Sequence, residues 1–377
     1  MKVLIVSGIW PPDVGGPASH APDVARFLRS HGHDVEVVIT ASAAPGPEPY
    51  PVRWTSRRLP VGVRHLHSLV LIAWRALGAD AVYTTGMFGR SGAAAMLARR
   101  PLVLKLTGDP AFERLRARGV VQGDIDAFQR AQGGGPSARA LRRLRNWVVR
   151  RADHVFTPSS YLRDLVVSWG VVPERVSLMP NPAPDSRPSA RRADLRRRFG
   201  LDGNTLAFAG RLTAQKSLDV MLAAVAASAG VTLLIAGDGE ERETLVEGIS
   251  RLGLGDRVRL LGPVPRDEVL DLFAAVDATV LSSSWENFPH SVVESLAVGT
   301  PVIATRAGGV SEVVEDGVNG LLVPVGDTAG LAAAIDQFFR DDALRERLRA
   351  NAVASVAAYS ADRLLGAVVE KLEEAVR

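Results

Sequence analysis

Two glutamates in the C-terminal half, Glu286 and Glu294, are eight positions apart in a segment that leads from an apolar run into a helical pattern. Eight helical steps of about 100° would place the two side chains roughly 80° apart, so the pair is not expected on one helix face. Pro289 suits the first position of a helix, because its φ is preset and its missing N–H would have no partner there. We therefore predict that Glu286 lies in a loop and that Glu294 lies one to two turns inside the following helix.

The start of this helix is also expected to attract negative charge. The backbone amides of Asn287, Phe288 and His290 would point out of the helix, where the helix dipole is positive. Glu286 would then be a carboxylate beside a positive helix terminus, and both would face whatever ligand occupies the site.

A second polar segment follows a strand-like run earlier in the same half. Arg211 and Lys216 are five positions apart, and their guanidinium and ammonium groups could hold a diphosphate from two sides. The alternative is a solvated basic loop, which the expected position opposite the glutamate segment disfavours. Two glycine-containing stretches at other strand ends are interpreted as structural, with 236–239 forming a tight turn and 308–309 opening a further helix.

Together these segments resemble the retaining GT-B glycosyltransferases of glycosyltransferase family 4, and their order and spacing fit that family along the whole chain. The resemblance implies that Arg211 and Lys216 bind the donor diphosphate and neutralise charge on the departing nucleotide. It also implies that Glu286 holds a hydroxyl of the donor sugar while Glu294 accepts hydrogen bonds from the ribose.

The same resemblance extends the donor site to neighbouring residues. Asn287, Phe288 and Pro289 would contribute to donor binding beside Glu286, and the stretch around Val264 would meet the nucleobase through its backbone.

A glycine-containing loop follows the first strand-like run and precedes a helix expected to start near Ala18. Gly15 and Gly16 would let a phosphate or sugar approach the backbone amides closely, although a plain turn is the alternative. The loop resembles the N-terminal glycine loop of the family. It is not a G-x-G-x-x-G motif, and no acidic residue ends the second strand, so a nicotinamide cofactor is poorly supported.

Asp109 follows the strand-like residues 102–106, where many members of the family have a histidine. This sequence has Gly108 and Asp109 instead, so the role of the histidine is not transferred. Asp109 is a candidate catalytic residue that would contact hydroxyls of the acceptor or the donor. It could equally well cap the following helix.

Strand-like runs alternate with helical patterns along the chain, which predicts parallel sheets covered by helices. One series comprises residues 3–6, 35–39, 81–84, 102–106, 154–157 and 176–179, and a second comprises 206–209, 232–236, 258–261, 278–281, 302–304 and 321–323. We therefore predict an α/β fold of the GT-B type, with two Rossmann-like domains whose parallel sheets face a cleft.

A proline-rich stretch at 181–185 separates the two series. We assign residues 1–182 to an acceptor domain and 183–359 to a nucleotide-sugar donor domain, with the C-terminal helix 360–377 completing the first. Residues 112–135 show no regular pattern and are interpreted as a mobile loop for acceptor contacts. The arginine-rich segment 139–151 predicts a surface helix, with a membrane-surface helix as the alternative.

The composition limits the class of protein. The formal charge is +4, but no nucleic-acid-binding signature accompanies it, so no nucleic-acid partner is expected. The chain has no Cys, which fits a reducing cytoplasm. It has no run of 18 apolar residues and begins directly with a strand, so neither a membrane span nor a signal peptide is expected. We expect a cytoplasmic protein whose basic surface would allow peripheral contact with an anionic membrane.

The implied reaction moves a hexose-type sugar from a UDP- or GDP-linked donor to a hydroxyl of a glycan, glycolipid or small molecule, with retention, as in polysaccharide biosynthesis. No cofactor and no essential metal are expected, because Arg211 and Lys216 supply the positive charge. The alternatives are a sugar-nucleotide epimerase on the same scaffold and a catalytically silent binding subunit. A silent subunit would be free to lose the charged residues that are all present here.

Overall fold

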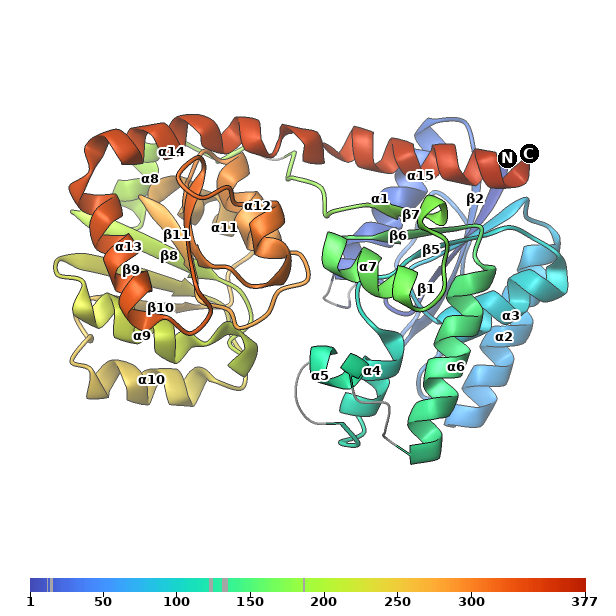
Figure 1. Cartoon of the computed structure of the whole chain (residues 1–377). Coiled ribbons are helices and arrows are strands. Elements are labelled where there is room, and N and C mark those ends of the chain that lie inside the picture. Colours follow the sequence, from blue (N-terminus) through green and yellow to red (C-terminus); the bar gives the residue numbers. More distant parts are fainter. Residues whose placement is uncertain (12, 14–15, 122–124, 131–134, 186) are drawn as a thin grey trace. The chain divides into compact units, whose positions relative to one another are not determined.

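The computed structural model describes the whole chain except residues 12, 14–15, 122–124, 131–134 and 186 (Figure 1). The described chain forms two compact units. The first comprises Met1–Met179 and Leu364–Arg377, and the second comprises Pro180–Arg363. These limits differ by three to four residues from the predicted boundaries at 182/183 and 359/360, and the C-terminal segment belongs to the first unit.

The first unit contains a seven-stranded parallel sheet in the order β3-β2-β1-β4-β5-β6-β7. The six strands predicted for this half are present within two residues of their expected bounds, and β3 is an additional strand. The strands are β1 (Lys2–Ser7), β2 (Asp34–Ala41), β3 (Val52–Ser56), β4 (Ala81–Thr84), β5 (Leu102–Lys105), β6 (His154–Thr157) and β7 (Val176–Leu178).

Helices surround this sheet, and α2, α3, α6 and α7 share one core with its central strands. The helices of the unit are α1 (Gly16–Ser30), α2 (Val61–Leu77), α3 (Phe88–Ala98), α4 (Pro110–Arg116), α5 (Ile125–Arg130), α6 (Gly135–Arg151), α7 (Ser160–Ser168), the short 3-10 helix η1 (Pro173–Arg175) and α15 (Ala361–Val376).

The interpretation of residues 112–135 as irregular is wrong for the described part of that region, which contains most of α4 and all of α5. Two local causes stabilise these short helices. Asp109 caps α4, and the side chains of Ile125 and Phe128 on α5 are buried.

The second unit contains a six-stranded parallel sheet in the order β10-β9-β8-β11-β12-β13, and every one of its strands was predicted from the sequence. The strands are β8 (Asn204–Ala209), β9 (Val231–Ala236), β10 (Val258–Gly262), β11 (Ala278–Leu281), β12 (Val302–Thr305) and β13 (Gly320–Val323).

The helices of the second unit cover both faces of this sheet. One core joins the sheet to α9, α10 and α12–α14, and another joins its opposite face to α8 and α11. The elements are α8 (Arg192–Arg198), η2 (Ala214–Lys216), α9 (Leu218–Ala227), α10 (Arg242–Arg251), α11 (Arg266–Ala275), α12 (His290–Ala297), η3 (Gly308–Glu312), α13 (Thr328–Arg340), α14 (Asp342–Ser355) and η4 (Ala357–Tyr359).

Each sheet reverses its strand order at one point, between β1 and β4 in the first unit and between β8 and β11 in the second. In sheets of this kind ligands bind beyond the carboxyl ends of the strands at such a switch point. The fold therefore directs attention to the loops that follow these four strands.

One helical stretch, Asp342–Val376, is long and apolar enough by length and composition to span a bilayer, which the sequence analysis did not expect. Core helices of soluble proteins can meet the same criterion. Within this stretch, α14 buries Leu348 in the second unit, and α15 buries Leu372 in the first.

Candidate active site

The glutamate segment has the predicted loop-then-helix arrangement. Glu286 lies in the loop after β11, and Glu294 lies in the second turn of α12. Pro289 is the N-cap, with φ −82° and ψ 110°, so the prediction that it is the first helical residue is off by one. The extended backbone at Pro289 directs the loop away from the helix axis and keeps the two glutamates off a common face.

Glu286 and Lys216, which were predicted from separate segments, are in contact. The Lys216 Nζ lies 2.5 Å from Glu286 Oε1, and Ser283 donates a hydrogen bond to the same oxygen at 2.6 Å. Glu286 is buried, so the ammonium and the hydroxyl replace the water that its charge would otherwise need. The loops are also held together by the Gln215 side chain, which donates to the Trp285 carbonyl at 2.6 Å.

Glycines allow the backbone of this site to pack closely. Gly308 has φ +51°, and a Cβ there would lie 2.0 Å from the Glu286 carbonyl oxygen. Gly309 donates its N–H to that same oxygen at 2.9 Å. Gly237 has φ +143°, and a Cβ on it would lie 1.9 Å from the Gly210 carbonyl oxygen beside Arg211. The structural interpretation of these two glycine stretches is therefore confirmed.

Glu294 has a partner that the sequence analysis missed. Arg266, the first residue of α11, donates from Nε to Glu294 Oε1 at 3.0 Å. Burial raises the pKa of Glu294, and the adjacent guanidinium opposes that rise. The two residues are 28 positions apart, and no local pattern in the sequence links them.

The other predicted donor-site residues differ in exposure. Arg211 is exposed, and no ion pair of its guanidinium occurs within the described part of the chain. Val264 is half-buried against the core under α8 and α11. Asn287 is half-buried, whereas Phe288 is buried and packs edge-on against Tyr359 with ring centroids 5.7 Å apart. Phe288 therefore also anchors the loop.

Asp109 adopts the capping role that the sequence analysis left open. Its Oδ1 accepts the Ala111 N–H at 2.8 Å, and its Oδ2 accepts from Gln129 at 2.7 Å and from the guanidinium of Arg145. The residue is fully buried. This geometry favours the cap over a contact with substrate, and the catalytic role stays a prediction.

Gly15 lies outside the described residues, so its predicted contact with the donor is not addressed by the structure. Gly16 is the first residue of α1. The glycine loop therefore precedes a helix, although that helix begins two residues before the expected start near Ala18.

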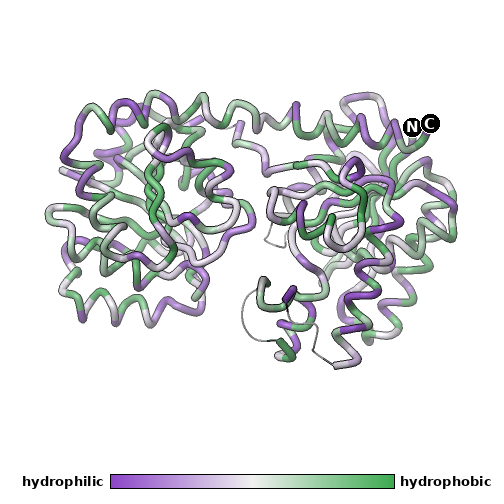
Figure 2. Tube along the Cα trace, viewed as in Figure 1, coloured by the Kyte–Doolittle hydropathy of each residue, from purple (hydrophilic) through white to green (hydrophobic). Residues whose placement is uncertain are grey.

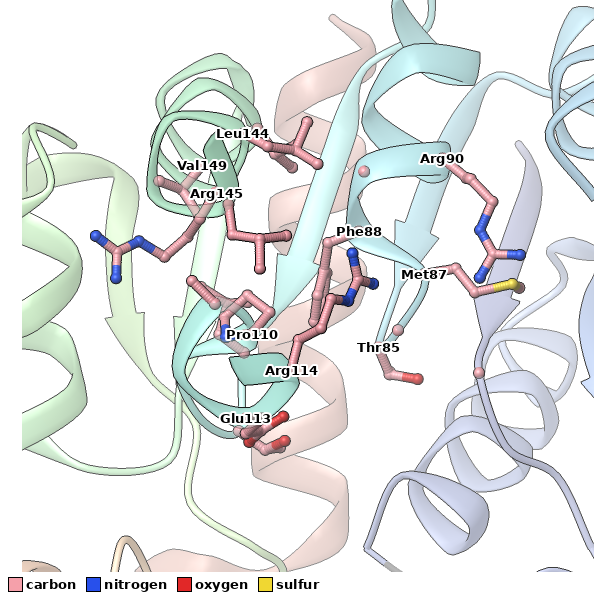
Figure 3. A pocket seen from close by; sticks show the side chains of 18 of the residues that line it. Thr85, Met87, Phe88, Arg90, Pro110, Glu113, Arg114, Leu144, Arg145 and Val149 are labelled. Atoms are coloured by element: carbon pink, nitrogen blue, oxygen red, sulfur yellow. The ribbon is translucent and has the colours of Figure 1, made fainter. Parts of the chain in front are cut away.

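The first unit has a cavity of about 500 Å³ at its switch point (Figure 3). Gly8, Thr85 and Thr107, which follow β1, β4 and β5, form its base, and α3, α4 and α6 form its walls. The wall from α6 includes the apolar Leu144 and Val148 together with Arg145, whose guanidinium is paired with Asp109.

The charged residues of the described chain that line this cavity are three arginines, Arg90, Arg114 and Arg145, and the acidic residue Glu113. Arg90 and Arg114 both line it, and Figure 3 shows them directed toward the same region near Met87 and Phe88. Burial lowers the pKa of Arg90 to about 10, and the nearby charges of Arg114 and Arg64 contribute to that fall. Arg90 donates to the Ser68 hydroxyl at 2.5 Å.

A buried polar chain lies behind the ends of β4 and β5. The Nζ of Lys105 is 3.4 Å from His20 Nδ1, and His20 Nε2 is 2.7 Å from the Tyr83 hydroxyl. Burial lowers the pKa of Lys105 to about 7 and raises the pKa of Tyr83. Lys105 is therefore poised to lose its proton near neutral pH.

Within the described residues, no group of three or more His, Cys, Asp or Glu side chains gathers in a way that could hold a metal ion. Each unit has cationic side chains of its own: Lys216, Arg211 and Arg266 near the glutamate segment of the second unit, and Arg90 and Arg114 at the cavity of the first.

The chain thus has two parallel α/β units, with the Lys216–Glu286 ion pair before α12 in one and a cavity at the switch point of the other, as two-domain α/β enzymes do. Comparison with known proteins specifies the family. Residues 192–354 match the family model "Glycosyl transferases group 1", and residues 15–182 match "Glycosyl transferase 4-like domain".

Individual relatives agree. The GDP-mannose-dependent alpha-mannosyltransferase of Mycobacterium tuberculosis (strain CDC 1551 / Oshkosh) is 30% identical over 346 residues, which cover 87% of this chain and 85% of that protein. The lipopolysaccharide core biosynthesis glycosyltransferase LpsE of Rhizobium meliloti (strain 1021) is 43% identical, but over only 37% of this chain and 40% of LpsE.

A solved structure has the same fold. Anabaena Alr3699/HepE, crystallised in complex with UDP-glucose, superposes with a TM-score of 0.78 at 25% identity, covering 99% of this chain and 100% of that one. The chain belongs to the group 1 glycosyltransferases of the GT-B fold, and it is accordingly a glycosyltransferase.

Proposed function

We propose that this enzyme transfers a hexose from a UDP- or GDP-linked sugar to a hydroxyl acceptor, with retention of the anomeric configuration. The observation that carries the proposal is the Lys216–Glu286 contact in front of α12. It sets a cation for phosphate and a carboxylate for sugar hydroxyls side by side, at the carboxyl ends of the β8 and β11 strands.

The chemistry follows from these charges. Breaking the anomeric C–O bond places negative charge on the leaving diphosphate and positive charge on the sugar ring. A lysine ammonium has three donors, so Lys216 can keep Glu286 and still bind a phosphate oxygen. Arg211 is exposed and has no competing ion pair among the described residues, so it is available to the second phosphate. Glu286 stabilises the cationic sugar.

The nucleoside end of the donor is assigned to Glu294, whose Oε1 is already oriented by Arg266. A carboxylate held in this way accepts the two ribose hydroxyls, and the backbone around Val264 meets the base. Both donor types are kept in the proposal, because Alr3699/HepE is crystallised with UDP-glucose and the mycobacterial relative is named for GDP-mannose.

The acceptor is assigned to the 500 Å³ cavity of the first unit. Arg90 and Arg114 favour an acceptor that carries a phosphate or carboxylate close to its reactive hydroxyl. The apolar wall of Leu144 and Val148 favours an apolar group or a sugar face on the other side. A role in polysaccharide or glycolipid biosynthesis fits both features.

We also propose that the enzyme needs no metal, since Lys216 and Arg211 supply the charge that a metal would. Transfer should persist unchanged in excess chelator after dialysis. A loss of rate that added Mg²⁺ or Mn²⁺ restores would contradict this part of the proposal. The absence of Cys supports a cytoplasmic location, which a fusion to a compartment-specific reporter tests.

The primary experiment measures thermal stability with UDP, GDP and their sugar conjugates. A ligand at 100 times its dissociation constant stabilises its unit by about 2.7 kcal/mol. Lys216→Ala and Arg211→Ala should lose most of the shift that a nucleoside diphosphate causes, and both should respond to the free nucleoside as the parent does. Arg251→Ala, an exposed arginine on α10, is the matched control and should behave as the parent.

Activity assays then separate the enzyme from its alternatives. Slow hydrolysis of the bound donor, with the released sugar analysed by NMR before mutarotation, should give the retained anomer. Donor binding without hydrolysis or transfer to any acceptor would identify a silent subunit. An isomerised sugar nucleotide as the product would identify an epimerase. If no nucleoside diphosphate or sugar conjugate stabilises the protein, the donor assignment is wrong.

A further inference from the structure

Helix α2 carries a row of large apolar side chains on its outward face. At about 100° per residue, the five positions fall within an arc of roughly 80°. They are Val63, Leu66, Val70, Trp74 and Leu77, with exposed fractions of 54%, 64%, 57%, 63% and 58%. We call these five residues the α2 stripe.

The α2 stripe is separate from the face that α2 buries in the first unit. Ser68, Ile72 and Ala76 are the buried positions, and they lie on the opposite side of the helix. Packing within the unit therefore explains the apolar residues on one face of α2 and leaves the stripe without a partner in the described chain. Figure 2 shows apolar residues along much of this helix.

The neighbouring helix extends the apolar surface. Helices α2 and α3 pack against each other, and α3 exposes Met96 and Leu97 at 49% and 65%. Single exposed apolar side chains are normal on protein surfaces, whereas five in one row, with two more on the helix packed beside it, indicate an interaction site.

The charge of this region is strongly asymmetric. Residues 53–108 contain nine Lys and Arg and one acidic residue, whereas the whole chain contains 45 and 41. The rest of the chain therefore has 36 basic and 40 acidic residues and is net negative. The positive net charge of the protein thus comes from this segment. The nine are Arg53, Arg57, Arg58, Arg64, Arg75, Arg90, Arg99, Arg100 and Lys105.

Ion pairing and burial account for part of this positive charge, since Arg57 pairs with Asp13 at 2.6 Å and Lys105 is buried. One carboxylate, Glu36, is shared by Lys2, Arg53 and Arg75 at 3.3 to 3.6 Å. Arg58 and Arg99 are exposed, and neither has an acidic partner within the described residues. The apolar surface is thus accompanied by cations that remain available to a partner.

We propose that the α2–α3 surface, formed by the α2 stripe with Met96 and Leu97, binds the surface of an anionic lipid bilayer. The apolar side chains would enter the boundary between headgroups and acyl chains, and the arginines would reach lipid phosphates. Trp74 suits that boundary, because its ring is apolar and its indole N–H is polar.

Charge also distinguishes lipid from another copy of this chain. Two α2–α3 surfaces brought together would juxtapose unpaired arginines of like sign, whereas an anionic bilayer neutralises them. We therefore assign membrane contact to the α2–α3 surface and not to residues 139–151, which the sequence offered as a membrane-surface helix. In α6 the apolar Val148 and Val149 are buried and line the cavity of the first unit.

The test uses the full-length protein and sedimentation with vesicles. One set of vesicles is phosphatidylcholine alone, and the other contains 30% phosphatidylglycerol. Binding should require the anionic lipid and weaken as the salt concentration rises. Because no donor is added, the result is independent of the proposed transferase reaction.

Substitutions then assign the surface. The double variant Leu66→Gln/Trp74→Gln keeps residues that suit a helix and should lower the partition coefficient at least tenfold. Arg58→Ala and Arg99→Ala should each lower it about fivefold, as expected for about 1 kcal/mol per surface charge. The matched control is Val246→Gln/Val353→Gln, which removes two helical valines of the second unit that are 48% and 55% exposed.

Donor hydrolysis by each variant confirms that it is folded, since none of these residues belongs to the donor site. Equal binding to both vesicle types, or equal loss in the control variant, would overturn the proposal. So would a lipid-independent dimer in sedimentation velocity that Leu66→Gln/Trp74→Gln converts to a monomer, because it would assign the surface to a second copy of the chain.

Discussion

Lys216 and Glu286 exemplify how single residues in this enzyme serve two purposes. Their contact satisfies a buried carboxylate, and in the proposed function it also holds both groups at the sugar diphosphate. Glu294 has a corresponding partner in Arg266, which is more than half exposed. Removing the Glu286 carboxylate would leave Lys216 without its anionic partner, whereas removing that of Glu294 would leave Arg266, which solvent can reach.

Glu286→Gln should depress turnover by about 100-fold or more while nucleotide binding stays nearly intact. The substitution removes an interaction that strengthens as the sugar becomes cationic, and it frees the Lys216 ammonium for the phosphates. Glu294→Gln should weaken nucleoside diphosphate and intact donor together, by about 1.5 to 3 kcal/mol, the value for a hydrogen bond to a charged group.

Calorimetry of nucleotide binding and single-turnover kinetics measure the two effects separately. The Ser283 hydroxyl remains as a partner for the side chain in Glu286→Gln, and Arg266 remains near the side chain in Glu294→Gln. Both variants should therefore fold. If both variants lost nucleotide affinity equally while Glu286→Gln turned over normally, Glu286 would be only a structural partner of Lys216.

Lys105 provides a pH test of the buried chain in the first unit. Burial lowers its pKa in the folded protein to about 7, whereas the unfolded value is about 10.4. Between pH 7 and about 10.4 the Lys105 amine is protonated in the unfolded state and neutral in the folded state. The free energy of unfolding therefore rises with pH across this range and falls as the pH is lowered towards 7. Lys105→Met should remove this dependence and raise stability at pH 7.

Denaturant unfolding between pH 6.5 and 9.5 measures the effect. Lys2→Met is the matched control, because the Lys2 side chain is 42% exposed, and it should retain the slope of the parent. A Lys105→Met variant whose stability follows the parent at every pH would show that the amine is not the source of the dependence.

At the scale of elements, the site depends on close packing between loops that follow neighbouring strands. The loop before η3 meets the loop before α12 at Gly308, where a Cβ would clash with the Glu286 carbonyl oxygen. The position of Glu286 thus depends on a glycine 22 positions away that makes no contact with the substrate in the proposed function.

Gly308→Ala should therefore reduce both stability and turnover. A non-glycine residue at positive φ costs about 1 kcal/mol, and displacement of the Glu286 backbone adds to that. Gly317→Ala is the control, since Gly317 has φ +74° and a Cβ added there would meet no atom within 4 Å. It should show only the smaller conformational effect in thermal unfolding, and its turnover should equal that of the parent. Equal losses in both variants would show that contact with the Glu286 loop is unimportant.

The sequence predicted the elements well where they are apolar and buried on both faces. The β1 and β12 strands read as continuous apolar runs, so their identification did not depend on tertiary contacts. The edge strand β3 was missed because Val52–Ser56 alternates with polar residues, follows a proline and is half-exposed. An edge strand of this kind is recognised only once its pairing with the neighbouring strand, here β2, is known.

The candidate site shows a similar division. Glu286, Glu294 and Lys216 were predicted because each lies near a strand end with a local signal. Arg266 was missed, since its role comes from a contact with a different helix. The role of Asp109 was left open, because the local cap was predictable but Arg145, which pairs with its other oxygen, is 36 positions away.

At the scale of the whole molecule, the chain passes from the first unit to the second and back, at 179/180 and 363/364. The core around α2, α3, α6 and α7 draws only on the first unit, and the two cores around β8–β13 draw only on the second. The two-domain plan was predictable from the two strand series. The α2 stripe was not, because an apolar helix indicates burial until its neighbours are known.

Because each of these three cores belongs to a single unit, we predict two separable unfolding transitions, one for each unit. Leu372→Ala in α15 removes a fully buried side chain of the first unit, and Leu348→Ala in α14 does the same in the second. Each should cost about 2 to 5 kcal/mol and lower only the transition of its own unit. A saturating nucleoside diphosphate should raise chiefly the transition that Leu348→Ala lowers, because Arg211, Lys216 and Glu294 of the proposed donor site lie in the second unit. Differential scanning calorimetry of the parent and both variants, with and without the nucleotide, distinguishes these outcomes. A single transition shifted equally by both substitutions would show that the C-terminal helices couple the two units into one cooperative structure.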